Sequence, residues 1–253
     1  MKRALVALYA LACIAGAGKA AAEWSADVHY ERFRWVESTD PRVTETGGRA
    51  GIGASWIQNS KASGWVAAYH GELYGGSVRY SGSYLFSGAP AEGTTVYSGI
   101  LNELNAIYRF SGERGFQLVT GLGLDYWTRK FSEIQSEDWS VVYGRLGAAL
   151  GGRTAQGWFA GGGVKYPIYV DEDAHFTDIG FDSNPRLHPL GATSAYADIG
   201  YRFGRHWTLS GYYDSYRFKE SLKAGTTIGG TGFLVWQPAS TAKAVGLRLQ
   251  HHF

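Results

Sequence analysis

The sequence predicts an all-β chain that closes into one antiparallel barrel and crosses a membrane with its strands. In the last strand, Val245, Leu247, Leu249, His251 and Phe253 share one face, while polar and small residues occupy the other. One apolar face and one polar face suit a wall between lipid and a hydrated lumen. Aromatic residues make up 15% of the chain and glycine is frequent at 36 residues, whereas only 6 residues are proline. After residue 22, no apolar run approaches the roughly 18 to 20 residues that a membrane helix needs.

Residues 1–22 have the layout of a secretory signal peptide, and residues 23–253 then form a single barrel domain. Lys2 and Arg3 precede an apolar run, and three alanines offer a cleavage site before Glu23. Cys13, the only cysteine, would leave with this segment, so no disulfide or cysteine metal site is expected. A lipoprotein signal around Cys13 is the alternative. Loss of Lys2, Arg3 and Lys19 leaves 21 of the 24 basic residues against 22 acidic ones, a balance that favours no nucleic-acid partner.

Period-two runs between turn signals predict ten strands, of which the first five are residues 24–36, 49–58, 64–80, 94–110 and 116–131. In the first strand the apolar residues change face after Tyr30, which indicates either a bulge or emergence from the membrane near Glu31. The fourth strand places Leu104 opposite Glu103. The fifth places leucines on the lipid side and Arg129 on the other side.

The remaining strands are residues 139–153, 157–170, 192–203, 207–219 and 241–253. In the eighth, Ile199 and its apolar neighbours oppose Asp198 and Arg202. Short turns at 59–61, 111–115, 154–156 and 204–206 alternate with longer connections at 37–48, 81–93, 132–138, 171–191 and 220–240. With an even count of ten, all short turns fall at the end of the barrel that holds both termini, as membrane barrels are built.

Charges of both signs collect at the inward positions. Buried charges must be paired, and a barrel of ten strands is narrow, so we expect a salt-bridged lumen plugged by side chains. A narrow path for small polar solutes is the alternative, although no ring of one sign is present to select an ion. The predicted inward residues are Asp27, His29, Glu31, His70, Glu72, Glu103, Arg109, Asp125, Arg129, Arg145, Lys165, Asp198, Arg202, Asp214 and Arg248.

The final strand, which stops on Phe253, resembles that of the Gram-negative outer-membrane β-barrels. The resemblance implies an outer-membrane location, periplasmic short turns and extracellular longer loops. It also implies contact with the lipid bilayer and lipopolysaccharide, and recognition of Leu247, Leu249 and Phe253 by the barrel-assembly machinery. No cofactor is expected. No metal is expected either, because the adjacent His251 and His252 point to opposite faces.

The best catalytic candidate lies in the fourth longer loop, where Asp173 and His175 could orient a water molecule. A barrel of ten strands with Asp and His two apart in this loop resembles the omptins, surface proteases that use an Asp-His pair and an Asp-Asp pair. The second pair belongs in the second loop, where this chain has only Glu92. Lipid A deacylases use serine and histidine, but spacing ties no serine to a histidine here.

The sequence therefore predicts a structural or surface-interaction protein, adhesin-like, that acts through its extracellular loops. A membrane-embedded hydrolase using Asp173 and His175, either a protease or a lipid A-modifying enzyme, is one alternative, and a narrow channel is the other. Residues 212–220 are dense in aromatic and charged side chains. They are interpreted as part of the outer aromatic girdle, or as a site for carbohydrate or lipopolysaccharide. The extracellular ligand is not specified by the sequence.

Overall fold

The computed structural model describes residues 22–58, 63–83, 88–111, 115–132, 135–151 and 156–253. Most of the predicted signal peptide, including Cys13, and the predicted turn at 59–61 lie outside these residues. The wall contains ten long strands, as predicted. They are β1 (Ala22–Glu37), β2 (Val43–Gln58), β3 (Gly64–Ser83), β4 (Pro90–Arg109), β5 (Gln117–Lys130), β6 (Ser136–Gly151), β7 (Gly157–Asp173), β9 (Ser194–Phe203), β10 (Trp207–Lys219) and β13 (Ser240–His252).

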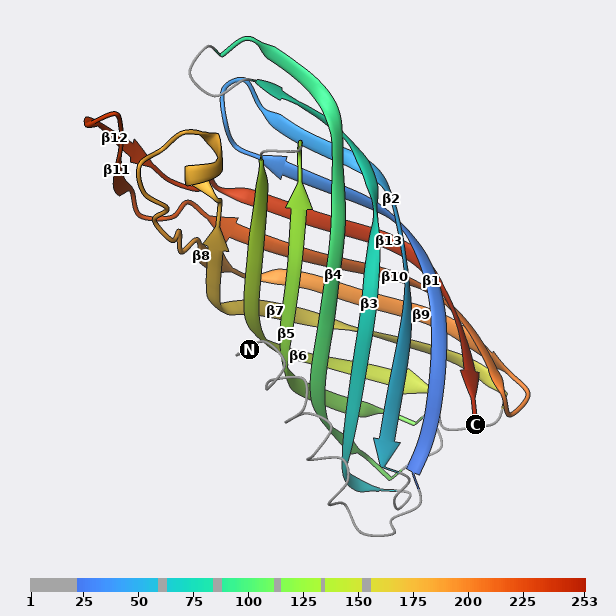
Figure 1. Ribbon diagram of the computed structural model, residues 1–253. Coiled ribbons are helices and arrows are strands. Elements are labelled where there is room, and N and C mark those ends of the chain that lie inside the picture. The colour runs from blue at the N-terminus through green and yellow to red at the C-terminus, as the bar shows by residue number, and fades with distance from the viewer. Residues whose placement is uncertain (1–21, 59–62, 84–87, 112–114, 133–134, 152–155) are drawn as a thin grey trace.

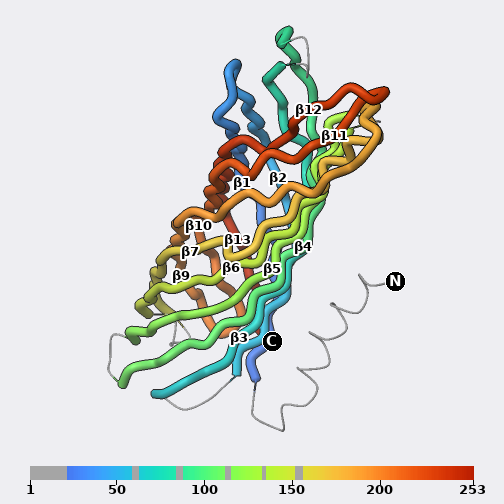
Figure 2. The backbone as a smooth tube through the Cα atoms, turned by 90° about the vertical axis from the view of Figure 1, so that its left-hand side faces the viewer, coloured from blue at the N-terminus to red at the C-terminus, as the bar shows by residue number. Residues whose placement is uncertain are grey.

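Each wall strand pairs antiparallel with its neighbours, and β13 pairs with both β1 and β10, so the sheet closes into a barrel. Figures 1 and 2 show the strands slanting around this cylinder, with the carboxyl terminus at the opposite end from β11 and β12. Phe253 extends the pairing beyond the last strand, since its backbone N–H donates to the carbonyl of Trp24 at 3.0 Å. The predicted closed antiparallel barrel of ten strands is confirmed.

The end of the barrel with the longer connections carries four short elements that the sequence did not predict. β8 (Leu190–Ala192) pairs with β10 just before β9 begins. The 3-10 helix η1 (Phe176–Ile179) lies between β7 and β8. β11 (Ala224–Ile228) and β12 (Thr231–Val235) form a separate hairpin within the predicted loop 220–240. Its two-residue turn is Gly229-Gly230, with φ of 53° and 82°, which suits the tight turns of hairpins.

Several strands are longer at the loop end than predicted. β2 begins at Val43, where the sequence indicated a loop up to residue 48, and β4 begins at Pro90. Of the two alternatives predicted near Glu31, the bulge is absent, because β1 stays in continuous register with β2 and β13. The apolar phase changes because Phe33 and Trp35 face the barrel interior, where they are 3% and 0% exposed.

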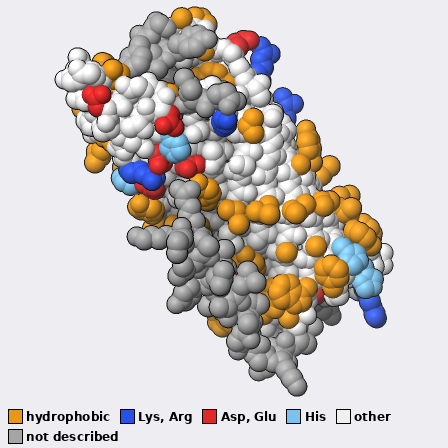
Figure 3. Space-filling model, viewed as in Figure 1, with side chains coloured by type: hydrophobic (Ala, Val, Ile, Leu, Met, Phe, Trp, Pro, Cys, Tyr) orange, Lys and Arg blue, Asp and Glu red, His pale blue; other side chains and the backbone are white. Residues whose placement is uncertain are grey.

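The outward side chains of the wall are large, apolar and exposed. Val28, Leu104, Leu122, Ile199 and Leu247 are each more than half exposed, whereas inward residues of the same strands are buried. A water-soluble monomer rarely exposes contiguous apolar surface on this scale, so the wall is built to face lipid. In Figure 3 hydrophobic side chains form a band across the visible wall, and charged side chains gather mainly toward the loop end.

No helix in the described part of the chain is long and apolar enough to cross a membrane.

Inward glycines make room for inward tyrosines. A Cβ atom at Gly246 would lie 2.5 Å from Cζ of Tyr212, and a Cβ atom at Gly123 would collide with the ring of Tyr143. Each ring lies over the backbone of the glycine that is its partner on the neighbouring strand, which a larger residue would prevent. The glycines therefore allow the tyrosine hydroxyls to reach buried carboxylates.

Candidate functional site

An aromatic cluster fills the lumen toward the loop end. Trp139, which is 0% exposed, lies at its centre. Its ring is stacked on Trp127 with centroids 5.5 Å apart and meets Trp35 edge-on at 5.2 Å. Phe218 lies 5.5 Å from Trp139 on another side. These side chains come from β1, β5, β6 and β10, so they join distant parts of the wall and pack together inside the lumen. We call Phe33, Trp35, Tyr97, Trp127, Trp139, Tyr216 and Phe218 the aromatic plug.

Arg129 lies buried beside the aromatic plug and binds three carboxylates. It is 1% exposed, and its guanidinium lies 3.0 Å from Glu37, 3.2 Å from Glu137 and 3.7 Å from Glu45. Its Cζ also lies 4.7 Å from the ring centre of Trp35. A buried arginine fork can satisfy several carboxylates at once, so this cation holds together acidic residues of β1, β2 and β6.

Glu45 has two further donors. The hydroxyl of Thr95 donates to one of its oxygens at 2.8 Å, and the hydroxyl of Tyr97 donates to the other. Glu45 is 0% exposed, although the sequence placed it in a loop. The inward parity of β2 would have identified it if the strand had been started at residue 43.

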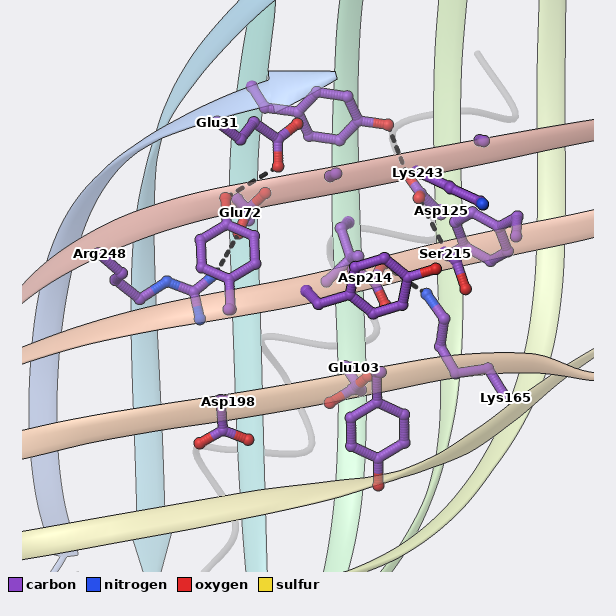
Figure 4. A pocket seen from close by; sticks show the side chains of 18 of the residues that line it. Glu31, Glu72, Glu103, Asp125, Lys165, Asp198, Asp214, Ser215, Lys243 and Arg248 are labelled. Atoms are coloured by element: carbon purple, nitrogen blue, oxygen red, sulfur yellow. Dashed lines mark hydrogen bonds and ion pairs between the residues drawn. The ribbon is translucent and has the colours of Figure 1, made fainter. Parts of the chain in front are cut away.

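Below the aromatic plug lies a cavity of about 360 Å³ with charged walls (Figure 4). Glu31 accepts bonds from Arg49 at 2.7 Å and from the Tyr212 hydroxyl at 2.8 Å. Lys165 binds Asp214 at 2.6 Å. Arg49 and Lys165 each have an acidic partner, on the adjacent strand for Arg49 and on the next strand but one for Lys165, which is what a structural interior requires.

Other predicted inward residues line the same cavity. Asp125 accepts hydrogen bonds from Tyr74 at 2.8 Å and from Tyr216 at 3.1 Å. Glu103 binds Arg145 and accepts from the hydroxyl of Tyr143 at 2.8 Å.

A histidine network lies on β1, β2, β3 and β13. Glu72 lies 3.0 Å from Arg248 and 3.4 Å from His29, and Arg248 lies 3.2 Å from Asp27. His70 and Glu72, both among the predicted inward residues, lie 3.3 Å apart. Ser55, which sequence spacing did not associate with it, lies 2.9 Å from Nδ1 of His70.

The remaining predicted lumen residues lie nearer the short-turn end. Arg202 binds Glu23 at 2.8 Å, and His252 lies at the same distance from that carboxylate. Asp198 lies on the cavity wall in Figure 4. Arg109 is the last residue of β4, in register with Gly64. Glu23 was not among the predicted inward residues, because the sequence indicated it only as the first residue after the signal peptide.

The loop-end site around His175 brings together more groups than the sequence indicated. His175 Nε2 lies 3.5 Å from Asp138 and 3.6 Å from Asp173, and Nδ1 lies 3.7 Å from Asp178. Nδ1 is also 3.1 Å from the hydroxyl oxygen of Ser136. Sequence spacing did not tie this serine to the histidine; the pairing of the ends of β6 and β7 brings them together.

Two carboxylates at this site are held by other residues. Asp138 accepts from the hydroxyl of Thr128 at 2.5 Å. Asp173 accepts from Asn184 at 2.5 Å and binds Arg186 at 2.9 Å. Burial alone would raise the pKa of Asp173, but the hydrogen bonds from Asn184 and the His175 amide hold this pKa below its ordinary value.

His175 itself has φ of 47°, the only positive φ among the described non-glycine residues. Such left-handed backbone in a non-glycine residue is uncommon and gathers at functional sites. Within the described ranges, no group of three or more His, Cys, Asp or Glu is placed to hold a metal ion.

The fourth loop is joined to the hairpin β11–β12. Asp182 accepts from the Thr227 hydroxyl at 2.6 Å and from the amides of Gly229 and Gly230 at 3.3 and 3.2 Å. The hydrogen bond from Thr227, followed by that from the Gly230 amide, lowers the pKa of Asp182. Ser183 adds a contact, since its hydroxyl oxygen lies 2.8 Å from that of Thr226.

No protein-family model and no curated protein matches this sequence. Solved structures do match. The outer membrane protease OmpT from Escherichia coli has a TM-score of 0.51 and 11% identity, covering 92% of this chain and 96% of that one. The transport unit of the autotransporter AIDA-I from Escherichia coli has a TM-score of 0.46 and 10% identity, covering 94% and 92%. The P. putida toluene transporter TodX has a TM-score of 0.33 and 8% identity, covering 91% and 89%. The likeness to OmpT supports a shared fold: this chain is a closed barrel of the outer-membrane type.

Proposed function

We propose that this protein is an integral outer-membrane barrel with a plugged lumen, and that it acts as a structural or surface-interaction protein through its extracellular loops. The observation that carries the proposal is the aromatic plug with buried Arg129, which fills the lumen at the loop end. If packed side chains occupy the lumen in this way, the loop surface is the place where a partner can bind. The lipid bilayer and lipopolysaccharide are the surrounding partners in this proposal.

The loop surface is preorganised. Asp182 and Ser183 fasten the fourth loop to the hairpin β11–β12, and Phe181 meets Phe233 edge-on with ring centres 6.0 Å apart. Ordering these segments before binding removes an entropic cost that a free loop would incur. This supports binding of an extracellular ligand to a fixed shape.

The proposal includes insertion through the last strand. Leu247 and Leu249 are 64% and 38% exposed on the lipid side of β13, and Phe253 is 76% exposed. Such an accessible apolar row suits recognition by the barrel-assembly machinery. Deletion of Phe253 is expected to lower the amount of inserted barrel without lowering the amount synthesised.

The test begins with membrane fractions. We expect the protein in the outer-membrane fraction, with a folded band that migrates differently from the boiled band, and with cleavage of loop 220–240 by protease added to whole cells. Planar-bilayer recordings should then show no steady conductance. Recovery of the folded protein without detergent would refute the barrel function, and regular single-channel steps would support the narrow channel instead.

A second candidate function is hydrolysis at the loop end, because Ser136 lies within hydrogen-bond distance of His175, and Asp138 faces the opposite ring nitrogen. The Ser136 oxygen would attack an ester or amide carbonyl while His175 accepts its proton. The same histidine would return the proton to the leaving group, and water would then release the acyl group from Ser136.

Hydrolysis is tested with Ser136→Ala, His175→Ala and the control Ser183→Ala, using peptide, lipid A and nitrophenyl ester substrates. The hydrolase function predicts turnover in the native protein that is lost in the first two variants and kept in the control. Equal activity in all four proteins, or none in the native one, would remove it.

A further inference from the structure

A serine, a histidine and a glutamate are linked on the lumen side of two paired strands. Ser55 of β2 and His70 of β3 are direct register partners, and the Ser55 hydroxyl oxygen lies 2.9 Å from Nδ1 of His70. Nε2 of the same ring lies 3.3 Å from Glu72, two residues further along β3. We call these three residues the lumen triad. They belong to other strands than Ser136 and His175 of the loop-end site.

The partners of the His70 ring determine which of its nitrogens carries a proton. Arg248 donates to Glu72 at 3.0 Å, so this carboxylate is ionised and can only accept hydrogen bonds. Nε2 therefore holds the N–H that Glu72 accepts, and Nδ1 keeps a lone pair. The Ser55 hydroxyl donates to this lone pair. In this arrangement an imidazole can take the proton of a serine nucleophile.

His29, in the same network, has a different environment. Its side chain is 0% exposed, and its two ring nitrogens lie 3.7 Å from Asp27 and 3.4 Å from Glu72, so both meet carboxylates. By contrast, 18% of the His70 side chain is exposed, and Ser55 is half-buried. His70 thus combines a serine partner with access for a small molecule.

The lumen triad borders the cavity below the aromatic plug, and Figure 4 shows Glu72 on its wall. The cavity extends from Trp127 of the plug to Ser55 and Gln250. Ser55 is three residues before the end of β2, and Gln250 is two residues before the end of β13. Both strands end at the short turns. A small molecule therefore reaches Ser55 from the end of the barrel that holds both termini.

N–H donors for an acyl transfer are present beside Ser55. Ser25 of β1 is the direct register partner of Ser55, and it accepts a hydrogen bond from Nε2 of Gln250 at 2.7 Å. Arg248 is two residues before Gln250 on the same face of β13, and it also lines the cavity. An amide and a guanidinium at this position can stabilise the negative charge that develops on a carbonyl oxygen during attack.

The charge and size of the cavity limit what can react there. Acidic residues outnumber the basic residues of the inward faces: the acids are Glu31, Glu72, Glu103, Asp125, Asp198 and Asp214, and the bases are Arg49, Arg145, Lys165 and Arg248. Lys243 also borders the cavity, but it is exposed on the outward face of β13. Asp198 forms no ion pair or hydrogen bond with another described side chain. An acidic excess disfavours anions, and a volume of about 360 Å³ admits only small molecules.

We propose that the lumen triad is a catalytic site that hydrolyses small neutral or cationic acyl esters, which enter from the short-turn end. In the proposed outer-membrane location this end faces the periplasm. The site differs from the loop-end candidate in its residues, in its side of access and in its substrate, since lipid A and long peptides do not fit the cavity.

The reaction has two steps. The Ser55 oxygen attacks the carbonyl carbon while Nδ1 of His70 accepts the hydroxyl proton. The bond to the alcohol oxygen then breaks, and His70 gives this proton to the departing alcohol. In the second step water attacks the acyl carbon and gives a proton to His70, the bond to Ser55 breaks, and the proton returns to the Ser55 oxygen. Glu72 stays ionised and acts as a positioning residue for the ring.

The test uses the full chain purified in neutral detergent, with the variants Ser55→Ala, His70→Ala and Glu72→Gln. The matched control is Ser77→Ala, a serine on the outward face of β3. Hydrolysis of 4-nitrophenyl butyrate, butyrylthiocholine and the anionic mono-4-nitrophenyl succinate is measured. A fluorophosphonate labels any activated serine, and peptide mass spectrometry locates the label. Heat-dependent migration on a gel verifies that each variant is folded.

We expect Ser55→Ala and His70→Ala to lose roughly 1,000-fold or more in kcat, and Ser77→Ala to match the native protein. The fluorophosphonate should label Ser55 of the native protein and not Ser210, which lines the same cavity in register with Arg248 and Gly200. Glu72→Gln should lower kcat and leave KM unchanged, because the amide carries no charge to stabilise the imidazolium. The anionic ester should react more slowly than butyrylthiocholine.

Three results would overturn the inference: no turnover by the native protein, equal turnover by folded Ser55→Ala, and labelling of a serine other than Ser55. The Ser55–His70 contact would then be a structural hydrogen bond of the lumen. If Ser55→Ala does not fold, the position of the label in the native protein decides. Faster reaction of the anionic ester would overturn the substrate class, and an effect of Glu72→Gln on KM alone would overturn its positioning role. Fractionation and conductance test the barrel function separately.

Discussion

Replacement of Arg129 by methionine should strongly destabilise the barrel. The guanidinium is 1% exposed and lies within 3.0 to 3.7 Å of Glu37, Glu45 and Glu137. Methionine keeps much of the length of the side chain but leaves these carboxylates without their cation. Breaking a buried ion pair from one side typically costs about 3 to 5 kcal/mol, and here several acids lose the same partner. We therefore expect a loss at the upper end of that range.

The matched control is Arg79→Met. Arg79 also binds a glutamate at 2.8 Å, but the side chains of Arg79 and Glu92 are 72% and 65% exposed. Exposed pairs contribute only about 0 to 1 kcal/mol, because water and salt screen both charges. Two arginine substitutions with the same change in composition should thus differ by several kcal/mol, and burial is the reason.

The assay is urea unfolding of the barrel reconstituted in lipid vesicles, followed by tryptophan fluorescence and by the change in gel migration. Equal midpoints for Arg129→Met and Arg79→Met would refute the reasoning, since the buried network would then contribute no more than a surface pair. An Arg129→Lys variant separates charge from shape. It should recover part of the loss, because lysine keeps the charge but cannot present a planar fork to several acids.

Other substitutions test the aromatic plug and the joined loops. Trp139→Ala should cost about 3 to 5 kcal/mol and raise planar-bilayer conductance, whereas Trp158→Ala, 69% exposed on the outer wall, should leave conductance unchanged. The lowered pKa of Asp182 means that its contribution to docking of the hairpin is complete above the ordinary value of 3.8 and is lost as the pH falls through the lowered pKa. Exchange protection of the Gly229 and Gly230 amides should fall over that acid range in the native protein and stay constant in Asp182→Asn. Gly230→Ala, at φ of 82°, should weaken the hairpin by about 1 to 2 kcal/mol; unchanged amide protection would contradict this.

The number of strands and the face on which each side chain lies were predictable. Side chains of a strand point alternately to its two faces, and the outer face of the wall is uniformly apolar. Leu104 and Glu103 show how adjacent residues divide, being 60% and 7% exposed. Strand ends were less predictable. Toward the loop end, Phe33 and Trp35 face inward while Arg32 and Arg34 face outward, so the apolar phase inverts without any break in the strand. A rule that assigns apolar residues to the outer face of the barrel therefore fails for the part of β1 near the loop end.

The partners of each inward residue could not be predicted. Alternation along a strand shows which face a residue occupies, but it does not show which residues of distant strands lie at the same level inside the closed barrel. Arg129 reaches Glu37, 92 residues away, and Tyr212 reaches Glu31, 181 residues away. The same reason hid Ser136, which is 39 residues from His175. The hairpin β11–β12 was different. Its Gly229-Gly230 turn lies between two short paired segments, and such a glycine pair is a sequence signal for a tight hairpin even within a long connection.

The joining of Asp182 to the turn at Gly229-Gly230 has a consequence for immunology. Segments 43 to 48 residues apart in the chain together form one surface at the loop end of the barrel. Antibodies raised against the folded protein should therefore recognise a discontinuous epitope. Synthetic peptides copied from either segment alone would be poor vaccine antigens.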